Sequence, residues 1–417
     1  NVQYINAGVA KSGAYYRYYS ATGITGGIAS TSTMKWADAT YNYAHANVDY
    51  YYEVSSSSSI GFSYDFASNS GTLTSTPRTI TNYSGTATTL SIGNRILVKH
   101  YNPSYSGIYS VSKALIALVV AKLVETGRLD LSKKVVDYWP EFGAHGKDLL
   151  TVRQLLSHQA GLPETKVGLT ADQIHTDHEA ASLLAAEQPF WAPGSAFGYH
   201  AVTIGILVSE LVFRITGKTL QEVFESEIRS VSGSDVYLGL PIELHGRFAP
   251  PLPPIEVSEP APEGSLRSHV FKLFADSNKI ENGIADLFFT RERLLFGAPA
   301  AGGVASARGL AHLFNWAVNQ NGISTTVLND FSKVQVHGHD QVLDQDDRAF
   351  GTLFMKPTSV CPFGSESAYG HDGAAGAIVF VDPAKEIILA YTVRRMTNPG
   401  GMDPRLIPVI DKLNLNI

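Results

Sequence analysis

Strand-forming runs lie on both sides of a long helical stretch, and they limit the folds open to this chain. Residues 96–98, Ile-Leu-Val, are typical of a buried strand. Near the other end, residues 377–381 and 386–392 are rich in β-branched and aromatic side chains. Asp382 and Pro383 between them suit the first two positions of a type I turn, so the spacing predicts a hairpin. The early strand and the late hairpin predict one sheet that the C-terminal part completes.

The middle of the chain predicts helices with recognisable ends. Ser110 opens a long apolar helix that we expect to end near Gly127, a residue suited to a helix C-cap. Other helix signals are the capping boxes Thr151 with Gln154 and Thr219 with Glu222, the runs 201–216 and 404–413, and Ser306 as a cap. Pro250 to Pro254 mark a loop that cannot be helical. These segments predict an α/β chain with a helical insertion.

Composition excludes several classes of protein. The 417 residues carry a net charge of −6, with 17% charged and 44% hydrophobic residues, which argues against a disordered chain and against a nucleic-acid partner. The longest apolar run, residues 114–121, is shorter than the roughly 20 residues that a membrane span needs. A single cysteine excludes internal disulfides. We expect a soluble protein, cytoplasmic or secreted, whose targeting signal was removed or never included, and its oligomeric state stays open.

Residues 1–90 differ from the rest of the chain. They hold eight charged residues, and residues 15–19 and 50–52 are rich in tyrosine, while residues 55–59 are all serine. Tyrosine, threonine, glycine and serine favour short strands and turns over helices. We therefore expect a β-rich segment that adds strands to the sheet formed by the later residues.

The run Ser110-Val111-Ser112-Lys113 is the strongest local sign of chemistry. A serine in the first turn of a helix lies beside free backbone N–H groups and the positive end of the helix dipole. Lys113 lies on the same face three residues later, and burial lowers the pKa of a lysine toward that of a usable base. This pattern is typical of an activated serine nucleophile. The alternative is a serine that only caps the helix and a lysine that reaches solvent.

Two further segments carry possible site residues. Tyr199 stands at a loop-to-helix junction, where a tyrosine can point into a cleft and transfer protons. Residues 369–376, which include His371 and Gly373, lead into the C-terminal hairpin, and their small side chains let a substrate approach the strand closely. A tyrosine that only packs and a plain glycine-rich turn are the alternatives.

Taken together and in this order, the three segments resemble the serine β-lactamase and penicillin-recognising family. Residues 138–142, 155–163 and 302–306 are also similar to landmarks of that family. The likeness is greatest to its carboxylesterase branch, the family VIII esterases, and covers residues 96–417. It implies a β-lactamase/DD-peptidase-like α/β (α+β) fold, with an antiparallel sheet flanked by helices and a mostly helical inserted subdomain. Residues 1–127 with 300–417 would form the α/β part and residues 128–299 the helical part, with the active site between them.

The resemblance also implies a role for each motif residue. Ser110 would be the nucleophile, Lys113 the base or proton relay, and Tyr199 would share that duty. The oxyanion hole would consist of the backbone N–H groups of Ser110 and Ala374. The substrate-binding residues would be His371, Gly373 and His200. The reaction would proceed through an acyl-enzyme that water hydrolyses, with no metal and no other cofactor.

Two departures from the family's pattern bear on the substrate. β-Lactamases of this kind have asparagine two residues after the motif tyrosine, where this chain has Ala201, and His371 stands where many penicillin-binding members have lysine. Loss of an amide and of a permanent cation weakens recognition of a lactam carboxylate. We therefore expect a carboxylesterase whose partner is a small, short-chain ester. The alternatives are a β-lactamase, a D-amino-acid peptidase or amidase, an acyltransferase of the same fold, and a non-catalytic binding protein.

Other motifs are absent or point to the surface. No G-x-S-x-G, P-loop or G-x-G-x-x-G occurs, so the α/β-hydrolase elbow and the common nucleotide-binding loops are missing. His175 with His178, and His337 with His339 and Asp340, have spacings that metal ligands can adopt. Both groups lie in polar, loop-like segments, and we expect surface histidines there.

Overall fold

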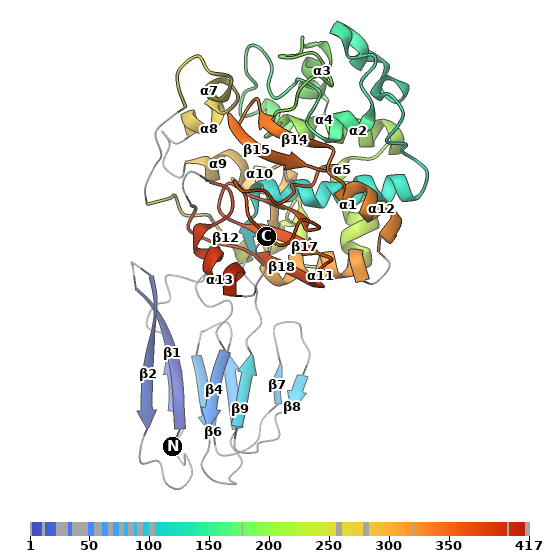
Figure 1. Cartoon of the computed structure of the whole chain (residues 1–417). Helices are drawn as coiled ribbons and strands as arrows, with labels where there is room; N and C mark the ends of the chain where they lie inside the picture. Colours follow the sequence, from blue (N-terminus) through green and yellow to red (C-terminus); the bar gives the residue numbers. More distant parts are fainter. Residues whose placement is uncertain are drawn as a thin grey trace. The chain divides into compact units, whose positions relative to one another are not determined.

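The computed structural model describes residues 105–417 except 177, 256–260, 278–282, 320–321, 398–399 and 413–417, and the backbones of nine strands in residues 1–104. Two compact units are present (Figure 1). One comprises Asn1–Ser104 and Gly246–Phe248, and the other comprises Tyr105–His245 and Ala249–Ile417.

The strands of the first unit form antiparallel pairs. The pairs are β1 (Val2–Ala10) with β2 (Gly13–Ala21), β4 (Asp49–Glu53) with β9 (Arg95–Lys99), and β7 (Thr79–Thr81) with β8 (Ala87–Thr89). β6 (Ser70–Thr74) lies between β3 (Ser32–Lys35) and β5 (Gly61–Asp65). β9 contains the strand predicted at residues 96–98 and pairs with β4, so the expectation that this early strand shares a sheet with the C-terminal hairpin is wrong. The described strands of residues 1–90 likewise pair with one another and not with the sheet of the later residues.

Helix α1 (Ser112–Glu125) is enclosed on nearly every side in the second unit. Residues 114–121 are fully buried, which is the behaviour of a helix that is apolar all round. A 3-10 turn, η1 (Tyr109–Val111), precedes the helix, and Gly127 follows it with a φ of 70°. The prediction of a long apolar helix that ends near Gly127 is therefore confirmed. α4 (Thr203–Thr216), α5 (Leu220–Val223) and α12 (Thr325–Ser332) pack against α1.

The antiparallel sheet of the second unit contains the predicted C-terminal hairpin. β17 (Ile378–Asp382) pairs with β18 (Ile387–Tyr391) on one side and with β16 (Tyr369–Asp372) on the other. β14 (Val336–Asp340) and β15 (Gln345–Phe350) form a further hairpin. Met355 makes bridges to both Phe350 and Gly370, so it joins the two hairpins. Through Met355, the β14–β15 hairpin is therefore connected to β16.

A smaller sheet lies against the start of α1. β13 (Gly303–Ala305) pairs with β10 (Tyr105–Gly107) and with β11 (Val236–Leu238), and β12 (Phe248–Ala249) lies next to β10 in the same sheet. α11 (Ala307–Asn319) begins after Ser306, whose hydroxyl accepts a hydrogen bond from the Gly309 N–H. Ser306 is therefore the helix cap that the sequence predicted. α11 packs against β17 and β18.

The remaining helices are short. They are α2 (Val152–Leu156), α3 (Glu179–Ala186), α6 (Ser230–Ser232), α7 (Leu266–Val270), α8 (Lys272–Ser277), α9 (Ile284–Phe288), α10 (Arg291–Phe296), α13 (Ile407–Lys412), and the 3-10 or π turns η2 (Val135–Asp137), η3 (Pro140–Gly146), η4 (Gln173–His175), η5 (Phe224–Arg229), η6 (Ile242–Arg247) and η7 (Pro404–Leu406). Both predicted capping boxes are present. Within the described ranges, no helix combines the length and apolar character needed to cross a membrane. The division at residues 127, 128, 299 and 300 stays a prediction.

Candidate active site

Ser110 lies in the turn that leads into α1. It is half-buried, whereas Tyr109 and Lys113 are fully buried. Tyr109 has a φ of 45°, a left-handed conformation that costs a non-glycine residue on the order of 1 kcal/mol. Packing holds it there, because its ring makes edge contacts with Phe288 and Phe289 at centroid distances of 6.0 and 5.1 Å. The strained turn therefore exposes Ser110 at the start of an otherwise buried helix.

Lys113 is buried in contact with the Ser110 hydroxyl. Its Nζ lies 3.0 Å from Ser110 Oγ, 2.7 Å from the Ala201 carbonyl oxygen and 3.1 Å from the Ala300 carbonyl oxygen. Desolvation by burial lowers the pKa of Lys113 to about 7, although the Asp372 carboxylate opposes that shift. A substantial fraction of the Lys113 amine is therefore neutral at neutral pH.

The three contacts of Lys113 match the bonding capacity of a neutral amine. Such an amine in water-free surroundings has two N–H bonds and one lone pair. The two carbonyl oxygens of Ala201 and Ala300 can accept hydrogen bonds but cannot donate them, so both N–H bonds are directed to these oxygens. The charged amine donates its third N–H to Ser110 Oγ. Once the amine is neutral, its lone pair faces this hydroxyl and can accept the hydroxyl proton. This geometry suits removal of the hydroxyl proton.

Tyr199 completes this group from the loop before α4. Its ring lies beneath Lys113, with Nζ 4.8 Å from the ring centroid, and it stacks on the Phe350 ring of β15 at a centroid distance of 6.0 Å. The Ser110 side chain acts on the Tyr199 phenol in the direction that lowers its pKa, against the larger effect of burial. Burial raises the pKa of Tyr199 far above its usual value, so the phenol keeps its proton at neutral pH. The structure thus brings Ser110, Lys113 and Tyr199 together, as the motifs predicted.

His371 lies on β16 beside the Tyr199 ring. The two ring centroids are 5.9 Å apart, and the His371 side chain is fully buried. Its Nδ1 lies 2.7 Å from the Asp372 carbonyl oxygen, to which it donates, while its Nε2 has no hydrogen-bond partner among the described residues. Burial, with the nearby charge of Lys113, holds the pKa of His371 well below its usual value. The imidazole is therefore neutral, and Nε2 is an unused acceptor.

Gly373 lies against the backbone of the nucleophile turn. A Cβ atom at this position would lie 2.4 Å from the Ile108 carbonyl oxygen and 3.3 Å from the Ser110 nitrogen. Only glycine permits this approach without a shift of the backbone. The next residue, Ala374, is half-buried. Its N–H as the second oxyanion-hole donor, beside that of Ser110, stays a prediction.

His200 is separated from this chemistry by its hydrogen bonds. The ring is fully buried, with Nδ1 2.6 Å from the Gly198 carbonyl oxygen and Nε2 accepting from the Leu162 N–H at 3.0 Å. Its backbone N–H donates to His158 Nδ1. Both ring nitrogens are therefore occupied by the surrounding loop. Substrate binding by His200 stays a prediction, and these contacts favour a structural role.

Two polar side chains near the site were not anticipated in these roles. The Ser112 hydroxyl donates to the Tyr109 carbonyl oxygen at 2.5 Å and accepts from the Gly303 N–H at 2.9 Å, which ties β13 to the nucleophile turn. The Asp340 carboxylate accepts from the Tyr199 N–H at 3.1 and 3.0 Å. Ser112 stands inside the nucleophile motif, where it could have been noticed. For Asp340, the sequence indicated only a spacing to His337 and His339 that metal ligands can adopt, and nothing linked it to Tyr199.

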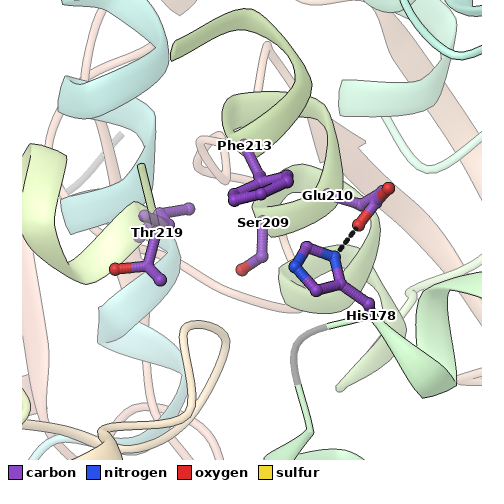
Figure 2. Close-up of a pocket in the computed structure, with 6 residues that line it drawn as sticks. His178, Ser209, Glu210, Phe213 and Thr219 are labelled. Carbon is purple, nitrogen blue, oxygen red and sulfur yellow. Dashed lines mark hydrogen bonds and ion pairs between the residues drawn. The ribbon is translucent and has the colours of Figure 1, made fainter. Parts of the chain in front are cut away.

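His178 lines a pocket elsewhere in the second unit. Figure 2 shows its imidazole beside the side chains of Ser209, Glu210, Phe213 and Thr219, which line the pocket with it. Nδ1 of His178 lies 2.6 Å from a Glu210 carboxylate oxygen. Ser209 Oγ is buried without a hydrogen-bond partner among the described residues. The residues that line this pocket do not include the Ser110 group.

The other histidines considered as metal ligands are engaged with protein groups. His337 and His339 are exposed and lie 2.6 and 2.9 Å from Asp347 and Asp346, as expected for surface residues. His175 differs from that expectation because it is half-buried, with Nε2 2.8 Å from the carbonyl oxygen of a residue on α9. In the part of the chain that the structure describes, no three His, Cys, Asp or Glu side chains are grouped as metal ligands.

The chain is similar to known proteins over most of its length. A family model described as Beta-lactamase matches residues 103–411. The chain is 30% identical over 308 residues to Esterase/beta-lactamase LipL of Mycobacterium tuberculosis, which covers 70% of each chain.

Two solved structures are similar over most of their length. EstA from Arthrobacter nitroguajacolicus Rue61a is 39% identical with a TM-score of 0.67, covering 76% of this chain and 88% of that one. A family VIII carboxylesterase is 25% identical with a TM-score of 0.66, covering 85% of this chain and 91% of the other. The matched residues include the Ser110 turn, the Tyr199 loop and β16.

Proposed function

The chain belongs to the Beta-lactamase family, and from that membership we propose that it is a carboxylesterase that forms an acyl-enzyme at Ser110. It has the β-lactamase/penicillin-binding fold and is a hydrolase of that fold with esterase relatives. The ester substrate and the roles of single residues are what we propose. The observation that supports them is the 3.0 Å contact between Lys113 Nζ and Ser110 Oγ, with both amine N–H bonds directed to carbonyl oxygens.

Acylation begins with attack of Ser110 Oγ on the ester carbonyl carbon. The neutral Lys113 amine takes the hydroxyl proton as the new C–O bond forms. The N–H groups of Ser110 and Ala374 stabilise the oxyanion of the tetrahedral intermediate. When the intermediate collapses, the bond to the leaving oxygen breaks, and that oxygen receives a proton from the Tyr199 hydroxyl while Lys113 reprotonates Tyr199. Burial keeps Tyr199 protonated, which fits it for this donor role.

Deacylation repeats these steps with water in place of the serine. The water oxygen attacks the acyl carbon, and its proton passes to Lys113. The second tetrahedral intermediate then expels Ser110 Oγ, which takes the proton back from the lysine, and the carboxylic acid leaves. The same base therefore serves both half-reactions, and Ser110 and Lys113 return to their starting states.

A short, neutral acyl group suits the charges at the site. The third motif offers His371, which burial keeps neutral, in place of a permanent cation. A substrate carboxylate would therefore find no fixed positive partner from this residue. The names of the relatives point the same way, since one solved structure is a family VIII carboxylesterase and LipL is named an esterase.

β-Lactam hydrolysis is the second candidate function, because LipL is also named a beta-lactamase. It uses the same Ser110 acylation and differs only in the acyl donor. D-amino-acid peptidase, amidase and acyltransferase activities share that chemistry. A non-catalytic binding protein is disfavoured because it has no need of a buried lysine in contact with a half-exposed serine.

Parallel turnover assays test the proposal. Wild-type chain, Ser110→Ala and the surface control Ser226→Ala are incubated with nitrophenyl acetate, butyrate and decanoate and with a chromogenic cephalosporin. We expect fast cleavage of the short esters, loss of on the order of 10⁴-fold in Ser110→Ala, and normal rates in the control. Intact-mass measurement during turnover should find the acyl group on Ser110. Cephalosporin cleavage as fast as butyrate cleavage would contradict the ester assignment, and no turnover of any substrate would contradict catalysis.

A further inference from the structure

The hairpin β14–β15 supports Tyr199 on two sides. On one side, Phe350 of β15 stacks on the phenol ring with an interplanar angle of 10°. On the other, Asp340 at the end of β14 contacts the Tyr199 backbone. Tyr199 lies in a loop between α3 and α4 with no strand or helix of its own. Its position relative to Ser110 therefore depends on what holds this loop.

The Asp340 carboxylate is the centre of a compact hydrogen-bond network. Both of its oxygens accept from the Tyr199 N–H, at 3.1 and 3.0 Å, and Oδ1 also accepts from Val342 at 2.9 Å and Leu343 at 2.8 Å. The residue is fully buried. A buried carboxylate is stable only where donors satisfy it, so this network has little freedom to rearrange. The carboxylate thus locks the Tyr199 backbone to the turn after β14.

The turn and the loop also touch at neighbouring positions. The Gln341 N–H donates to the Phe197 carbonyl oxygen at 3.0 Å. A Cβ atom on Gly198 would lie 2.9 Å from a Val342 methyl group and 3.1 Å from the Val342 nitrogen. Residues 197–199 therefore lie directly against residues 340–342, and the Asp340 bonds are the polar part of this contact.

We propose that Asp340 is a positioning residue that holds the Tyr199 hydroxyl in line with Ser110. The inference rests on the proposed function, because it needs Tyr199 to transfer a proton during turnover. Without the carboxylate, the Tyr199 N–H loses its acceptor, and the loop is free to shift. Misplacement of a catalytic group by about 1 Å is enough to slow a reaction on the order of 10²-fold.

A double-mutant cycle on turnover tests this role. Asp340→Asn keeps the shape of the side chain but presents an amide with one acceptor oxygen in place of two. We expect it to lower kcat for nitrophenyl butyrate by about 10- to 100-fold with little change in KM. In a Tyr199→Phe background, the same substitution should lower kcat by less than about threefold, because the group that Asp340 positions is already missing.

Asp382→Asn is the matched control. Asp382 is also a fully buried carboxylate at the end of a strand, and it accepts from the Ser365 N–H at 2.7 Å and the Ala384 N–H at 3.2 Å. It has no hydrogen bond to the Tyr199 loop among those of the described residues. We expect urea unfolding to show a similar loss of stability in both variants, but a lowered kcat only in Asp340→Asn. If Asp340→Asn does not fold, Asp340→Glu keeps the charge, displaces the carboxylate by one methylene, and should give the same coupling.

The outcomes separate this inference from the ester proposal. Independent, multiplying effects of the two substitutions, or an unchanged kcat in a folded Asp340 variant, would overturn the positioning role. If wild-type chain cleaves no ester but a fluorophosphonate labels Ser110, the ester proposal is wrong. The double-mutant cycle is then measured with the rate of Ser110 labelling in place of kcat. A smaller effect of Asp340→Asn in the Tyr199→Phe background than in the wild-type background supports the positioning role, and equal effects in both backgrounds overturn it.

Discussion

Lys113 Nζ lies 3.0 Å from Ser110 Oγ, at the first turn of a helix whose other residues are almost all apolar and buried. Burial that would make a lysine costly elsewhere is what allows it to act as a base here.

Activity should rise with pH around the pKa of Lys113. Desolvation lowers that pKa to about 7, and only the neutral amine can accept the Ser110 proton. We expect kcat/KM for nitrophenyl butyrate to fall about tenfold per pH unit below this value and to level off above it. Initial rates measured at a series of pH values from 5 to 9 give the pH dependence of kcat/KM. An acid limb that belongs to a group with an ordinary lysine pKa would contradict the assignment of Lys113 as the base.

Replacing Lys113 by an apolar side chain should stabilise the chain while it abolishes activity. The pKa of Lys113 is lower in the folded than in the unfolded state, so folding penalises its charged form. That penalty is complete below pH 7 and shrinks as pH rises toward the ordinary lysine pKa. For Lys113→Met we expect a gain in the free energy of unfolding of about 1–2 kcal/mol at pH 7, smaller at pH 9. Urea unfolding at both pH values measures it, and equal effects at both would refute this origin.

Removing the Tyr199 hydroxyl should slow turnover without unfolding the chain. The Tyr199→Phe ring can still stack on Phe350, so packing is preserved. We expect kcat to fall on the order of 10²-fold with KM nearly unchanged, as for loss of a proton-transfer group. Tyr369→Phe, a buried tyrosine on β16 that packs against Phe354, is the control and should retain normal kcat. A normal rate for Tyr199→Phe would remove Tyr199 from the mechanism.

A methyl group at Gly373 should damage the oxyanion side of the site. The added Cβ would collide with the Ile108 carbonyl oxygen at 2.4 Å and press on the Ser110 nitrogen at 3.3 Å. We expect Gly373→Ala to lower kcat at least about tenfold and to cost roughly 1–3 kcal/mol of stability. Gly246→Ala, where the added atom meets nothing within 4 Å, serves as the control. If Gly373→Ala and Gly246→Ala had the same kcat and the same stability, the close approach at Gly373 would not matter for the site.

Features set by residues three positions apart could be predicted from the sequence. The capping box of Thr151 with Gln154 and the pairing of Ser110 with Lys113 depend on one helical turn, whose geometry is the same in every protein. The C-terminal hairpin was predicted for the same reason, because a short turn fixes its register. The family itself followed from the order of three such local motifs.

Contacts between distant segments could not be predicted in this way. The bond between Asp340 and Tyr199 spans 141 residues, and no local pattern specifies such a partner. His200 illustrates a finer limit. It follows Tyr199 directly in the same motif, yet its ring nitrogens bond Gly198 and Leu162 while the Tyr199 ring meets Lys113. Which neighbour faces the substrate depends on backbone angles that the motif does not encode.

The strained Tyr109 turn has a consequence for the order in which activity is gained during folding. Phe288 and Phe289 pack against the ring and help to hold the left-handed backbone in place. If α1 forms first from local interactions, we expect its turn to relax and Ser110 to leave its strained position until the two phenylalanines have packed. We therefore expect reactivity to appear only after α9 and Phe289 have packed, so that a partly folded chain carries the catalytic side chains without being active.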